Sequence, residues 1–299
     1  MGRRPLLVRT VGELDDVRAG LTGSVALVPT MGALHEGHRA LLRTARQNAD
    51  HVVVSVFVNP LQFGPTEDFD RYPRDLDADL AICAADEVDV VFAPDGVEMY
   101  PQQPQVRVSP GPLGERFEGA VRPGHFEGVL TVVAKLFHLV RPELAVFGRK
   151  DAQQLALIRR MVADLNLPVR ILDVPTVREA DGLAASSRNR YLSDSDRARA
   201  AAFPQALNAA ARLAAEGGSP SELIERARRD LSAAVDAIDY LALVDAATFE
   251  EIDDARWGRF RGEALLIGAV RVGGTRLIDN VAVATPRQLA PRRKMRRNR

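Results

Sequence analysis

The sequence predicts an α/β protein with a Rossmann-like, doubly wound parallel sheet and a smaller α+β domain toward the C-terminal end. Three observations point there: strand and helix candidates alternate over residues 1–176, the strand candidates are apolar throughout, and the pattern changes after Pro175. Uninterrupted apolarity is typical of strands that helices cover on both faces, as in a parallel sheet. Alternation of strands and helices is the signature of a doubly wound fold.

The first domain is expected to span residues 1–176. Its strand candidates are short apolar runs at 24–28, 51–58, 88–92, 144–147 and 169–174. Its helix candidates begin at Gly37, with apolar residues at 41, 42 and 45, and continue at 76–85, 128–140 and 152–165. Each helix candidate follows a strand candidate, as crossover connections between parallel strands require.

The second domain is expected at residues 177–286. Two helices rich in Ala and Arg, at 194–216 and 219–235, are separated by two glycines, and apolar runs follow at 240–244 and 264–272. Residues 287–299 have no apolar pattern, so we expect a disordered basic tail.

Composition indicates a folded protein of the cytoplasm. The chain has 299 residues, of which 46% are hydrophobic and 27% are charged, which suits one large or two medium-sized domains. Cys83 is the single cysteine and is expected to be buried in a helix rather than to act as a nucleophile. The first residues lack the apolar core of a signal peptide, and no apolar run approaches the about 18 residues that cross a bilayer.

The chain has no net charge, but its basic and acidic residues are distributed unevenly along the sequence. The whole sequence has 40 basic and 40 acidic residues, and seven of the basic ones lie in 287–299, which leaves 33 against 40 and a net charge of −7 for the rest. A mildly acidic body argues against general nucleic-acid binding. The basic tail leaves one alternative function open, that of an RNA-associated protein anchored by the tail. The other interpretation of the tail is a solvated extension without function.

The first candidate site lies between the strand candidate at 24–28 and the helix candidate that begins at Gly37. Residues 29–38 read PTMGALHEGH and place His35 and His38 on one helix face. Helix N-termini attract anions, and Gly32 and Gly37 allow a ligand to approach the backbone closely. The segment therefore predicts a phosphate site with two imidazole donors, which could stabilise charge on a phosphoryl oxygen. The alternative is a pair of surface histidines at a helix start.

A second cluster, FGRKDAQQ at 147–154, also joins a strand end to a helix start. Ligands of open α/β sheets bind at this edge. Lys150 could contact a phosphate, Asp151 could accept hydrogen bonds from ribose hydroxyls, and Gln154 could bind a small polar substrate. Alternatively, Asp151 caps the helix and Lys150 is solvated.

Two polar loops complete the candidates. Residues 181–191 read DGLAASSRNRY and combine two serines with two arginines, which can surround a polyphosphate. The alternative is a polar turn between domains, with Ser193 or Asp194 capping the next helix. Residues 59–62, NPLQ, follow the strand candidate at 51–58. They could present amides to a carboxylate or a hydroxyl, or they could form an ordinary turn.

In this order the clusters resemble the pantothenate synthetase family, which has the HxGH nucleotidyltransferase type of Rossmann-like fold and joins pantoate to β-alanine with ATP. The resemblance covers residues 24–283. It rests on PTMGALHEGH at 29, FVNPLQF at 57, YPR at 72, RPGHFEGV at 122, FGRKDAQQ at 147, VREADGLAASSRNRYLS at 177 and TRLIDNVAV at 275. HxGH alone is shared by a wide superfamily, whereas its combination with NPLQF, RPGHF and SSRNRYLS is specific.

The resemblance implies which residues bind ATP and act on it. The catalytic residues would be His38, as proton donor, with His35, Lys150 and Arg188. The ATP-binding residues would be Met31, Gly32, Ala33, Leu34, His35, Glu36, Gly37, His38, Gly148, Arg149, Lys150, Asp151, Val177, Ala185, Ser186, Ser187 and Arg188.

The resemblance also implies the other ligands. Gln62 and Gln154 would hold pantoate, with Gln62 also near β-alanine, and Asn59 would add its amide to the substrate site. Mg²⁺ would be bound mainly by ATP and by an acidic residue after YPR. Asp79 is the candidate for that residue, and a solvated helix residue is the alternative.

Three residues depart from the usual family pattern. Arg149 stands where the family often has Glu, Ala152 where it has an aromatic residue, and Ala185 where it has Met. These residues flank the implied contacts, so they bear on pocket shape and rate rather than on the identity of the site.

The resemblance implies a two-step reaction, in which pantoate and ATP form pantoyl adenylate and β-alanine then displaces AMP. We expect the C-terminal domain to close as a lid that keeps water from the adenylate. We also expect a homodimer built through the N-terminal domains, and neither a membrane nor a nucleic acid as partner. The nearest alternative is another HxGH nucleotidyltransferase, which would transfer a nucleotide and form no amide.

Overall fold

The computed structural model describes residues 4–65 and 67–285, and the chain divides into two compact units, Met1–Arg190 and Tyr191–Arg299. The division lies later than the boundary expected after residue 176. One contact that holds the intervening stretch in the first unit joins Ser187 Oγ, as donor, to the carbonyl oxygen of Ala33, 3.1 Å away. The tail predicted at 287–299 lies outside the described residues.

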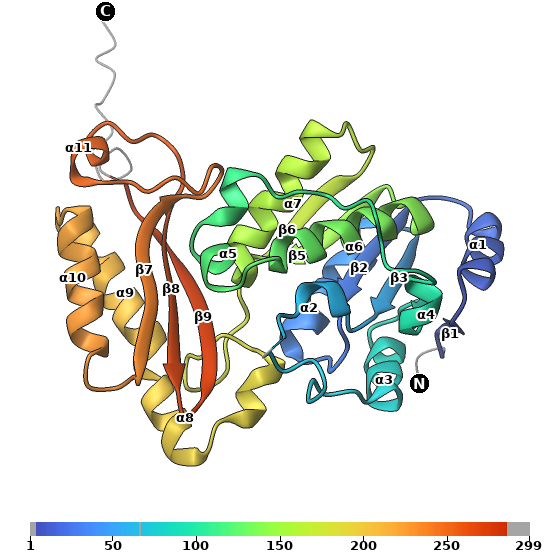
Figure 1. Cartoon of the computed structure of the whole chain (residues 1–299), viewed down its shortest axis with the longest axis horizontal. Helices are drawn as coiled ribbons and strands as arrows, with labels where there is room; N and C mark the ends of the chain where they lie inside the picture. Colours follow the sequence, from blue (N-terminus) through green and yellow to red (C-terminus); the bar gives the residue numbers. More distant parts are fainter. Residues whose placement is uncertain (1–3, 66, 286–299) are drawn as a thin grey trace, which may run out of the picture. The chain divides into compact units, whose positions relative to one another are not determined.

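The first unit is built on a six-stranded sheet in which every pairing is parallel, with helices on both faces (Figure 1). Its strands are β1 (Leu6–Val8), β2 (Val25–Thr30), β3 (His51–Val56), β4 (Val90–Phe92), β5 (Leu144–Gly148) and β6 (Arg170–Val174). Its α-helices are α1 (Val11–Gly20), α2 (Glu36–Asn48), α3 (Leu76–Ala85), α4 (Gly96–Met99), α5 (Glu118–Val121), α6 (His125–Val140) and α7 (Ala152–Asp164). Its short 3-10 helices are η1 (Pro60–Gln62), η2 (Pro112–Glu115) and η3 (Arg149–Asp151), and η4 (Ser187–Tyr191) follows at its end.

The strand order β1-β4-β3-β2-β5-β6 places β2 between β3 and β5. The chain builds outward from β2 on one side and then crosses to β5 on the other. Ligands of such sheets bind at the carboxyl ends of the strands, where the order reverses. The segments that follow β2, β3 and β5 include 31–38, 59–62 and 149–154, so three of the predicted clusters lie at one edge of the sheet.

Two apolar cores cover the two faces of this sheet. Residues of α1, α6 and α7 pack on one face, where Phe92 and Ile158 are fully buried. Residues of α2 and α3 pack on the other face, where Leu42 and Cys83 are fully buried. The predicted doubly wound fold is thereby confirmed, as is the burial of the single cysteine, and burial raises the pKa of its thiol to about 12.

Some elements differ from the sequence-based prediction. Neither β1 nor α1 was predicted, because β1 has three residues and α1 buries only Leu14, so neither gives a strong apolar pattern. The helix expected at 194–216 is two helices, which meet at Ala201. The segment 275–283, noted only as a family motif, is a strand.

The second unit is a three-stranded antiparallel sheet with helices, which confirms a smaller α+β domain. Its elements are α8 (Asp194–Ala200), α9 (Ala202–Ala215), α10 (Pro220–Leu231), β7 (Ala237–Asp245), α11 (Asp254–Trp257), β8 (Ala264–Val272) and β9 (Thr275–Val283). Ser193 caps α8 by accepting the amide N–H of Asp196, at 3.1 Å. Gly273 and Gly274, with φ of +56° and +78°, form the tight turn between β8 and β9. In the described part of the chain, no helix has the length and apolar character to cross a membrane.

Candidate functional site

The segment after β2 is held by a buried carboxylate from α3. Asp79 accepts the backbone N–H of Ala33 at Oδ2 (3.0 Å) and that of Leu34 at Oδ1 (2.7 Å), and it is 2% exposed. Gly32 and Ala33 adopt positive φ angles of +79° and +50°. A Cβ on Gly32 would lie 2.8 Å from Asp79 Oδ2, so the turn requires glycine.

This geometry bears on the expectation that Asp79 binds Mg²⁺. Both of its oxygens face backbone donors. Burial raises the pKa of its carboxyl, against the lowering effect of these two hydrogen bonds. The residue is therefore neither the solvated helix residue of the alternative nor an exposed metal ligand. Its carboxylate shapes the segment that leads to His35.

His35 and His38 cap α2 together. His35 Nδ1 accepts the amide N–H of Gly37 (3.1 Å), and His38 Nδ1 accepts the amide N–H of His35 (3.3 Å). The two rings lie side by side, with 4.1 Å between their centroids. The alternative of two surface histidines is wrong, because both rings are largely enclosed and engaged at the helix start.

These hydrogen bonds fix the tautomers of both rings. A backbone N–H can only donate, so each Nδ1 is unprotonated and each Nε2 carries the proton. Burial, with a further contribution from Lys150, lowers the pKa of His35 to about 4. Burial, with contributions from His35 and Lys150, lowers the pKa of His38 to about 3. Near pH 7 the pair therefore offers two neutral Nε2–H donors.

The segment after β5 carries Lys150, whose positive charge contributes to the lowered pKa of both imidazoles. Lys150 Nζ lies 3.7 Å from Asp151 Oδ1. Asp151 precedes α7 but makes no capping hydrogen bond with its side chain, so the capping alternative is wrong. Arg149 pairs with Asp173, at the end of the neighbouring strand β6.

The stretch 185–188 lies against the segment after β2. Ser187 donates to the carbonyl oxygen of Ala33, and Ala185 donates its N–H to the carbonyl oxygen of Val177 (2.9 Å). Arg188 donates to both oxygens of Asp68, at 2.9 and 2.8 Å. Burial opposes ionisation of Asp68, but these bonds outweigh it and lower the pKa of that carboxyl.

Gln62 ends the short helix η1 after β3. Its side chain donates to the sulfur of Met31 (3.0 Å) and accepts from Asn59 Nδ2 (3.1 Å). Gln62 therefore lies beside the segment that leads to the two histidines, as expected for a shared site.

Asn59 differs from its expected role. It is 1% exposed, and its Nδ2 also donates to the carbonyl oxygen of Gly128. Its Oδ1 accepts from the amide of Leu61 and from the hydroxyl of Tyr100. Every donor and acceptor of this side chain is thus engaged within the protein, so Asn59 positions Gln62 and does not present a free amide to substrate.

The two glutamines of α7 have different roles. Gln153 is buried and binds backbone groups of Leu113, Arg116 and Glu118. Gln154 is half-buried, and within the described residues no hydrogen bond engages its amide. Of the two, Gln154 is the side chain with capacity left for a ligand.

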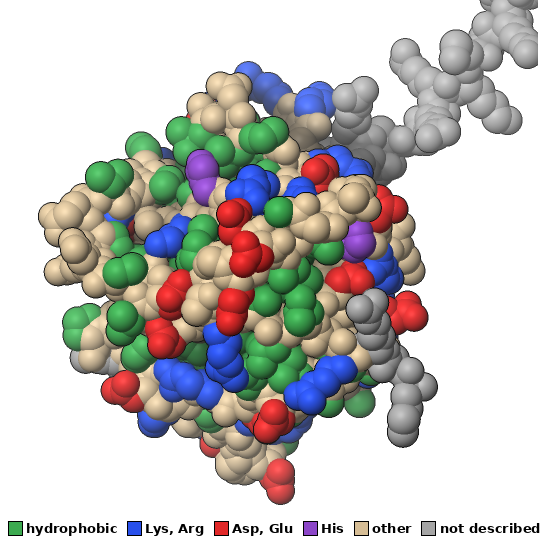
Figure 2. Space-filling model, turned by 90° about the vertical axis from the view of Figure 1, so that its right-hand side faces the viewer, with side chains coloured by type: hydrophobic (Ala, Val, Ile, Leu, Met, Phe, Trp, Pro, Cys, Tyr) green, Lys and Arg blue, Asp and Glu red, His purple; other side chains and the backbone are tan. Residues whose placement is uncertain are grey.

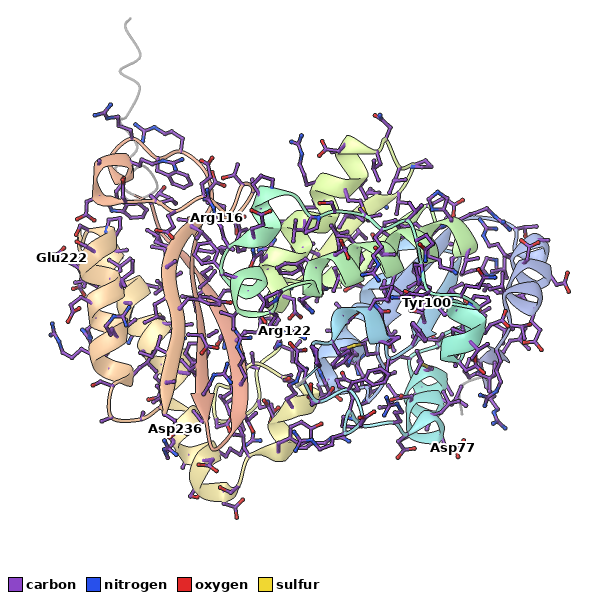
Figure 3. The ribbon with its side chains drawn as sticks, viewed as in Figure 1. Asp77, Tyr100, Arg116, Arg122, Glu222 and Asp236 are labelled. Carbon is purple, nitrogen blue, oxygen red and sulfur yellow. The ribbon has the colours of Figure 1, made fainter. Side chains whose placement is uncertain are left out.

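Several residues around the site were missed by the sequence analysis, namely Glu67, Asp68, Tyr72, Arg122 and His125. The motif YPR, which contains Tyr72, and the motif RPGHFEGV, which contains Arg122 and His125, were noted without a chemical role, and Glu67 and Asp68 lie in neither motif. Arg122 lies just before α6 (Figure 3), and its Nε donates to Glu67 Oε1 at 2.8 Å. These contacts join residues 55 positions apart, so spacing along the chain could not have revealed them.

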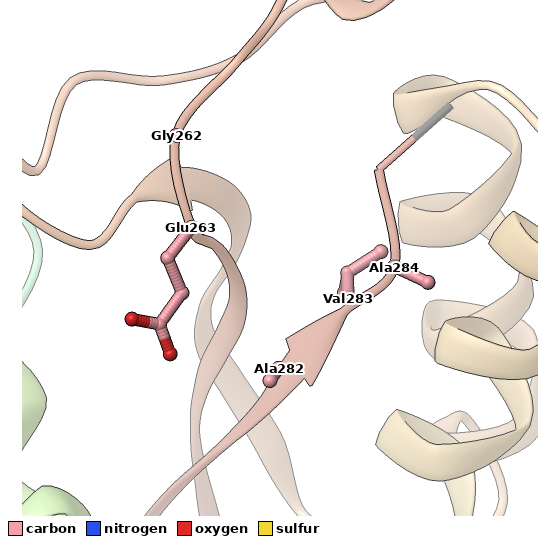
Figure 4. Close-up of a pocket in the computed structure, with 5 residues that line it drawn as sticks. All are labelled: Gly262, Glu263, Ala282, Val283 and Ala284. Carbon is pink, nitrogen blue, oxygen red and sulfur yellow. The ribbon is translucent and has the colours of Figure 1, made fainter. Parts of the chain in front are cut away.

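Two further features of the described surface bear on ligand binding. Figure 2 shows acidic and basic side chains mixed over one face, without an extended basic area. A pocket in the second unit is lined by Gly262, Glu263 and 282–284 (Figure 4). Its one charged side chain is acidic, so it does not offer the donors that phosphates need. Among the described residues, no group of three or more His, Cys, Asp or Glu could hold a metal ion.

Known proteins resemble this chain over almost its whole length. The sequence model of the pantoate-beta-alanine ligase family matches residues 6–282. The pantothenate synthetase of Acidothermus cellulolyticus is 72% identical over 278 residues, which are 93% of this chain and 91% of that protein.

Solved structures give the same result. The crystal structure of pantothenate synthetase from Thermus thermophilus superposes with a TM-score of 0.87 at 49% identity, covering 96% of this chain and all of that one. The pantoate-beta-alanine ligase of Francisella tularensis, complexed with beta-gamma ATP and beta-alanine, gives a TM-score of 0.79 at 31% identity, over 93% and 97% of the two chains. The likeness therefore includes both units.

Proposed function

The chain belongs to the pantoate-beta-alanine ligase family, and we propose that it condenses (R)-pantoate with β-alanine through a pantoyl adenylate, releasing pyrophosphate and AMP. The observation that carries this proposal is the pair of neutral Nε2–H donors at the start of α2, beside Lys150. That set suits a phosphoryl group whose charge increases during a reaction.

In the first step, a carboxylate oxygen of pantoate attacks the α-phosphorus of ATP, and the bond from that phosphorus to the bridging oxygen breaks. Pyrophosphate leaves with that oxygen. His35 and His38 donate hydrogen bonds to the phosphates, and Lys150 and Arg188 add positive charge. Because the imidazole pKa values are about 4 and 3, we assign His38 the role of a neutral hydrogen-bond donor rather than that of an imidazolium acid.

We assign the nucleotide to residues 31–38, 148–151, 177 and 185–188. Gly32 and the N-terminus of α2 provide backbone access for phosphates. Pantoate is assigned to Gln62 and Gln154, which lie on η1 and α7. The Francisella relative was crystallised with a nucleotide and β-alanine, which supports these two ligand classes for the present chain.

In the second step, the uncharged amine of β-alanine attacks the carbonyl carbon of the adenylate. The bond from that carbon to the bridging oxygen of the phosphate breaks, and AMP leaves with that oxygen. The nitrogen passes one proton to the departing phosphate as the amide forms. Binding both reactants in one site supplies the proximity advantage. Water would hydrolyse the mixed anhydride, so closure of the second unit as a lid stays part of the proposal.

Mg²⁺ is also part of the proposal, and it would neutralise charge on the phosphates when bound. Asp79 does not fit as a direct ligand, because its oxygens accept two backbone N–H groups in a buried setting. We therefore assign the metal mainly to the phosphates of ATP. The homodimer, the cytoplasmic location and the absence of a nucleic-acid partner stay predictions from the resemblance and the composition.

The test is exchange of labelled pyrophosphate into ATP, with and without pantoate and in the absence of β-alanine. The proposal expects exchange that requires pantoate, followed by release of AMP that requires β-alanine. Exchange with another acceptor only would favour the alternative HxGH nucleotidyltransferase. If no exchange occurs with any acceptor tested, both functions are contradicted. Arg149, Ala152 and Ala185 would then be the residues to examine for a loss of activity.

A further inference from the structure

The motif RPGHFEGV, residues 122–129, has no role in the reaction described above. We propose that it positions Gln62, with His125 as the decisive residue, and thereby sets the affinity for pantoate. This inference rests on the proposed function, because it takes Gln62 to be a pantoate ligand. His125 and Arg122 act through Gln62 and need not touch the substrate.

The main-chain carbonyl oxygen of Gln62 is the point of contact. It lies 2.9 Å from His125 Nδ1 and 3.3 Å from the Nη2 of Arg122. The side chain of Gln62 is held by Asn59 and faces Met31. Backbone and side chain of this residue are thus fixed independently, which is the arrangement that a precise binding group needs.

The neighbours of His125 determine its tautomer. A carbonyl oxygen can only accept, so Nδ1 carries the proton that is donated to Gln62. Arg122 Nη1 can only donate, and it lies 3.1 Å from Nε2, so Nε2 is the acceptor. Burial, together with the charge of Arg122, lowers the pKa of His125 to about 4, and the ring is neutral at pH 7.

Arg122 is in turn held by acidic side chains. Its Nε and Nη2 donate to the two oxygens of Glu67, and its Nη1 lies 3.7 Å from Glu118. The guanidinium has little freedom, since its side chain is only 12% exposed. Glu67, Arg122 and His125 therefore form a chain of contacts that ends on the carbonyl of Gln62.

Gly128, in the same motif, brings α6 against η1. A Cβ at this position would lie 2.2 Å from the carbonyl oxygen of Leu61 and 2.6 Å from the amide nitrogen of Gln62. Only glycine allows this approach, and the carbonyl of Gly128 also accepts from Asn59. Three residues of one motif thus converge on Gln62 and its neighbour.

Two variants of His125 separate its two hydrogen bonds. The amide nitrogen of His125→Asn replaces Nδ1 and can still donate to Gln62, but nothing replaces Nε2. The side-chain end of His125→Gln replaces Nε2 and can still accept from Arg122, but nothing replaces Nδ1. KM for pantoate and for ATP would be measured for the wild type and both variants, in pantoate-dependent pyrophosphate exchange.

We expect His125→Gln to raise the KM for pantoate about three- to tenfold, the effect of one net hydrogen bond, with the KM for ATP unchanged. His125→Asn should stay near the wild type. In a Gln62→Ala background, the difference between the two variants should disappear.

Equal behaviour of the two variants, whether normal or impaired, would overturn the inference, as would a larger defect in His125→Asn. A parallel rise in both KM values would also overturn it, because it would indicate general disruption. Failure of the proposed function is distinguishable, since the wild type itself would then show no exchange with pantoate.

Discussion

Three imidazoles of the first unit each donate from one defined nitrogen. His35 and His38 accept backbone N–H groups at Nδ1 and donate from Nε2, whereas His125 donates from Nδ1 to a carbonyl oxygen. Burial lowers the pKa of all three to about 4, 3 and 4, respectively. At pH 7 all three rings are therefore neutral donors of fixed orientation, and positive charge near them comes from Lys150 and Arg122.

His38 allows a direct test of this assignment. In His38→Asn, the amide oxygen replaces Nδ1 and keeps the cap, but the donor at Nε2 is lost. We expect kcat for pyrophosphate exchange to fall by about 10²–10³, as on removal of one oxyanion donor. His38→Gln keeps a donor at the Nε2 position and should lose much less. A larger loss in the Gln variant would show that capping, not donation, is the main role of this residue.

Asp79 is predicted to be a structural carboxylate. The amide of Asp79→Asn has a single acceptor oxygen, so it leaves one of the two N–H groups of Ala33 and Leu34 without an acceptor. We expect the free energy of unfolding to fall by about 1–3 kcal/mol. The Mg²⁺ concentration for half-maximal exchange should stay the same. Asp77→Asn, on the exposed face of the same helix (Figure 3), is the matched control and should change neither value. A clear rise in the Mg²⁺ requirement of Asp79→Asn alone would restore the metal-ligand interpretation.

The histidines, Lys150 and the glutamines could be proposed as site residues from the sequence alone, because each lies in a local motif near the end of a strand. The sequence did not reveal what Asp79 does, since its partners Ala33 and Leu34 lie about 45 residues earlier in the chain. Such contacts depend on the packing of α3 against the sheet and leave no periodic signal. Nor does the sequence indicate that the amide of Asn59 is fully engaged within the protein, because Gly128 and Tyr100 lie far from it in the chain.

Helix α6 and the short helix η1 approach each other so closely that Gly128 has no room for a Cβ atom. Gly128→Ala would place a methyl group 2.2 Å from the carbonyl oxygen of Leu61, so helix and loop must separate. We expect a loss of about 1–3 kcal/mol in unfolding free energy, as in other overpacked sites, and a higher KM for pantoate.

Gly12→Ala, in α1, is the control for this substitution. An added Cβ there would meet nothing within 4 Å, and alanine is the better helix former. Its unfolding free energy should be unchanged or raised by up to about 1 kcal/mol. Equal stability of the two variants in urea unfolding would contradict the close approach of α6 to η1.

The central strands were predictable because continuous burial on both faces demands apolar residues, as in β3, whose inner positions 52–55 are buried. The short edge strand β1 was not, because three residues contain too little pattern. The bounds of α3 and β8 agree with the prediction, since turn residues or breaks in apolarity flank both elements. Helix α2 begins one residue earlier than expected because His35 caps it with an imidazole, which propensity rules do not anticipate.

For the molecule as a whole, the division into a parallel α/β unit and a smaller antiparallel unit was predictable from the change of pattern after Pro175. The position of the division was less predictable, because the polar stretch 177–190 has no apolar run of its own. It belongs to the first unit, to which hydrogen bonds such as that of Ser187 to Ala33 join it.

Stability of the whole molecule should depend on pH through the buried histidines. Their folded pKa values of about 4, 3 and 4 lie below the ordinary value of 6.5. Between these values the unfolded chain binds more protons, so the free energy of unfolding should fall as pH is lowered from about 6.5 toward 4, by up to about 1.4 kcal/mol per pH unit for each histidine. Urea unfolding at several pH values measures this slope. His125→Asn should have a shallower slope, and a stability that stays flat from pH 7 to pH 4.5 would contradict neutral burial of these rings.

If the carboxylate of pantoate is activated as an adenylate, one of its oxygens must end in AMP. Pantoate labelled with ¹⁸O in its carboxylate would be incubated with the protein, ATP and β-alanine, and the products analysed by mass spectrometry. We expect one ¹⁸O in the phosphate of AMP, because the carbon–oxygen bond breaks in the second step. Label in pyrophosphate or inorganic phosphate, or AMP without label, would contradict it.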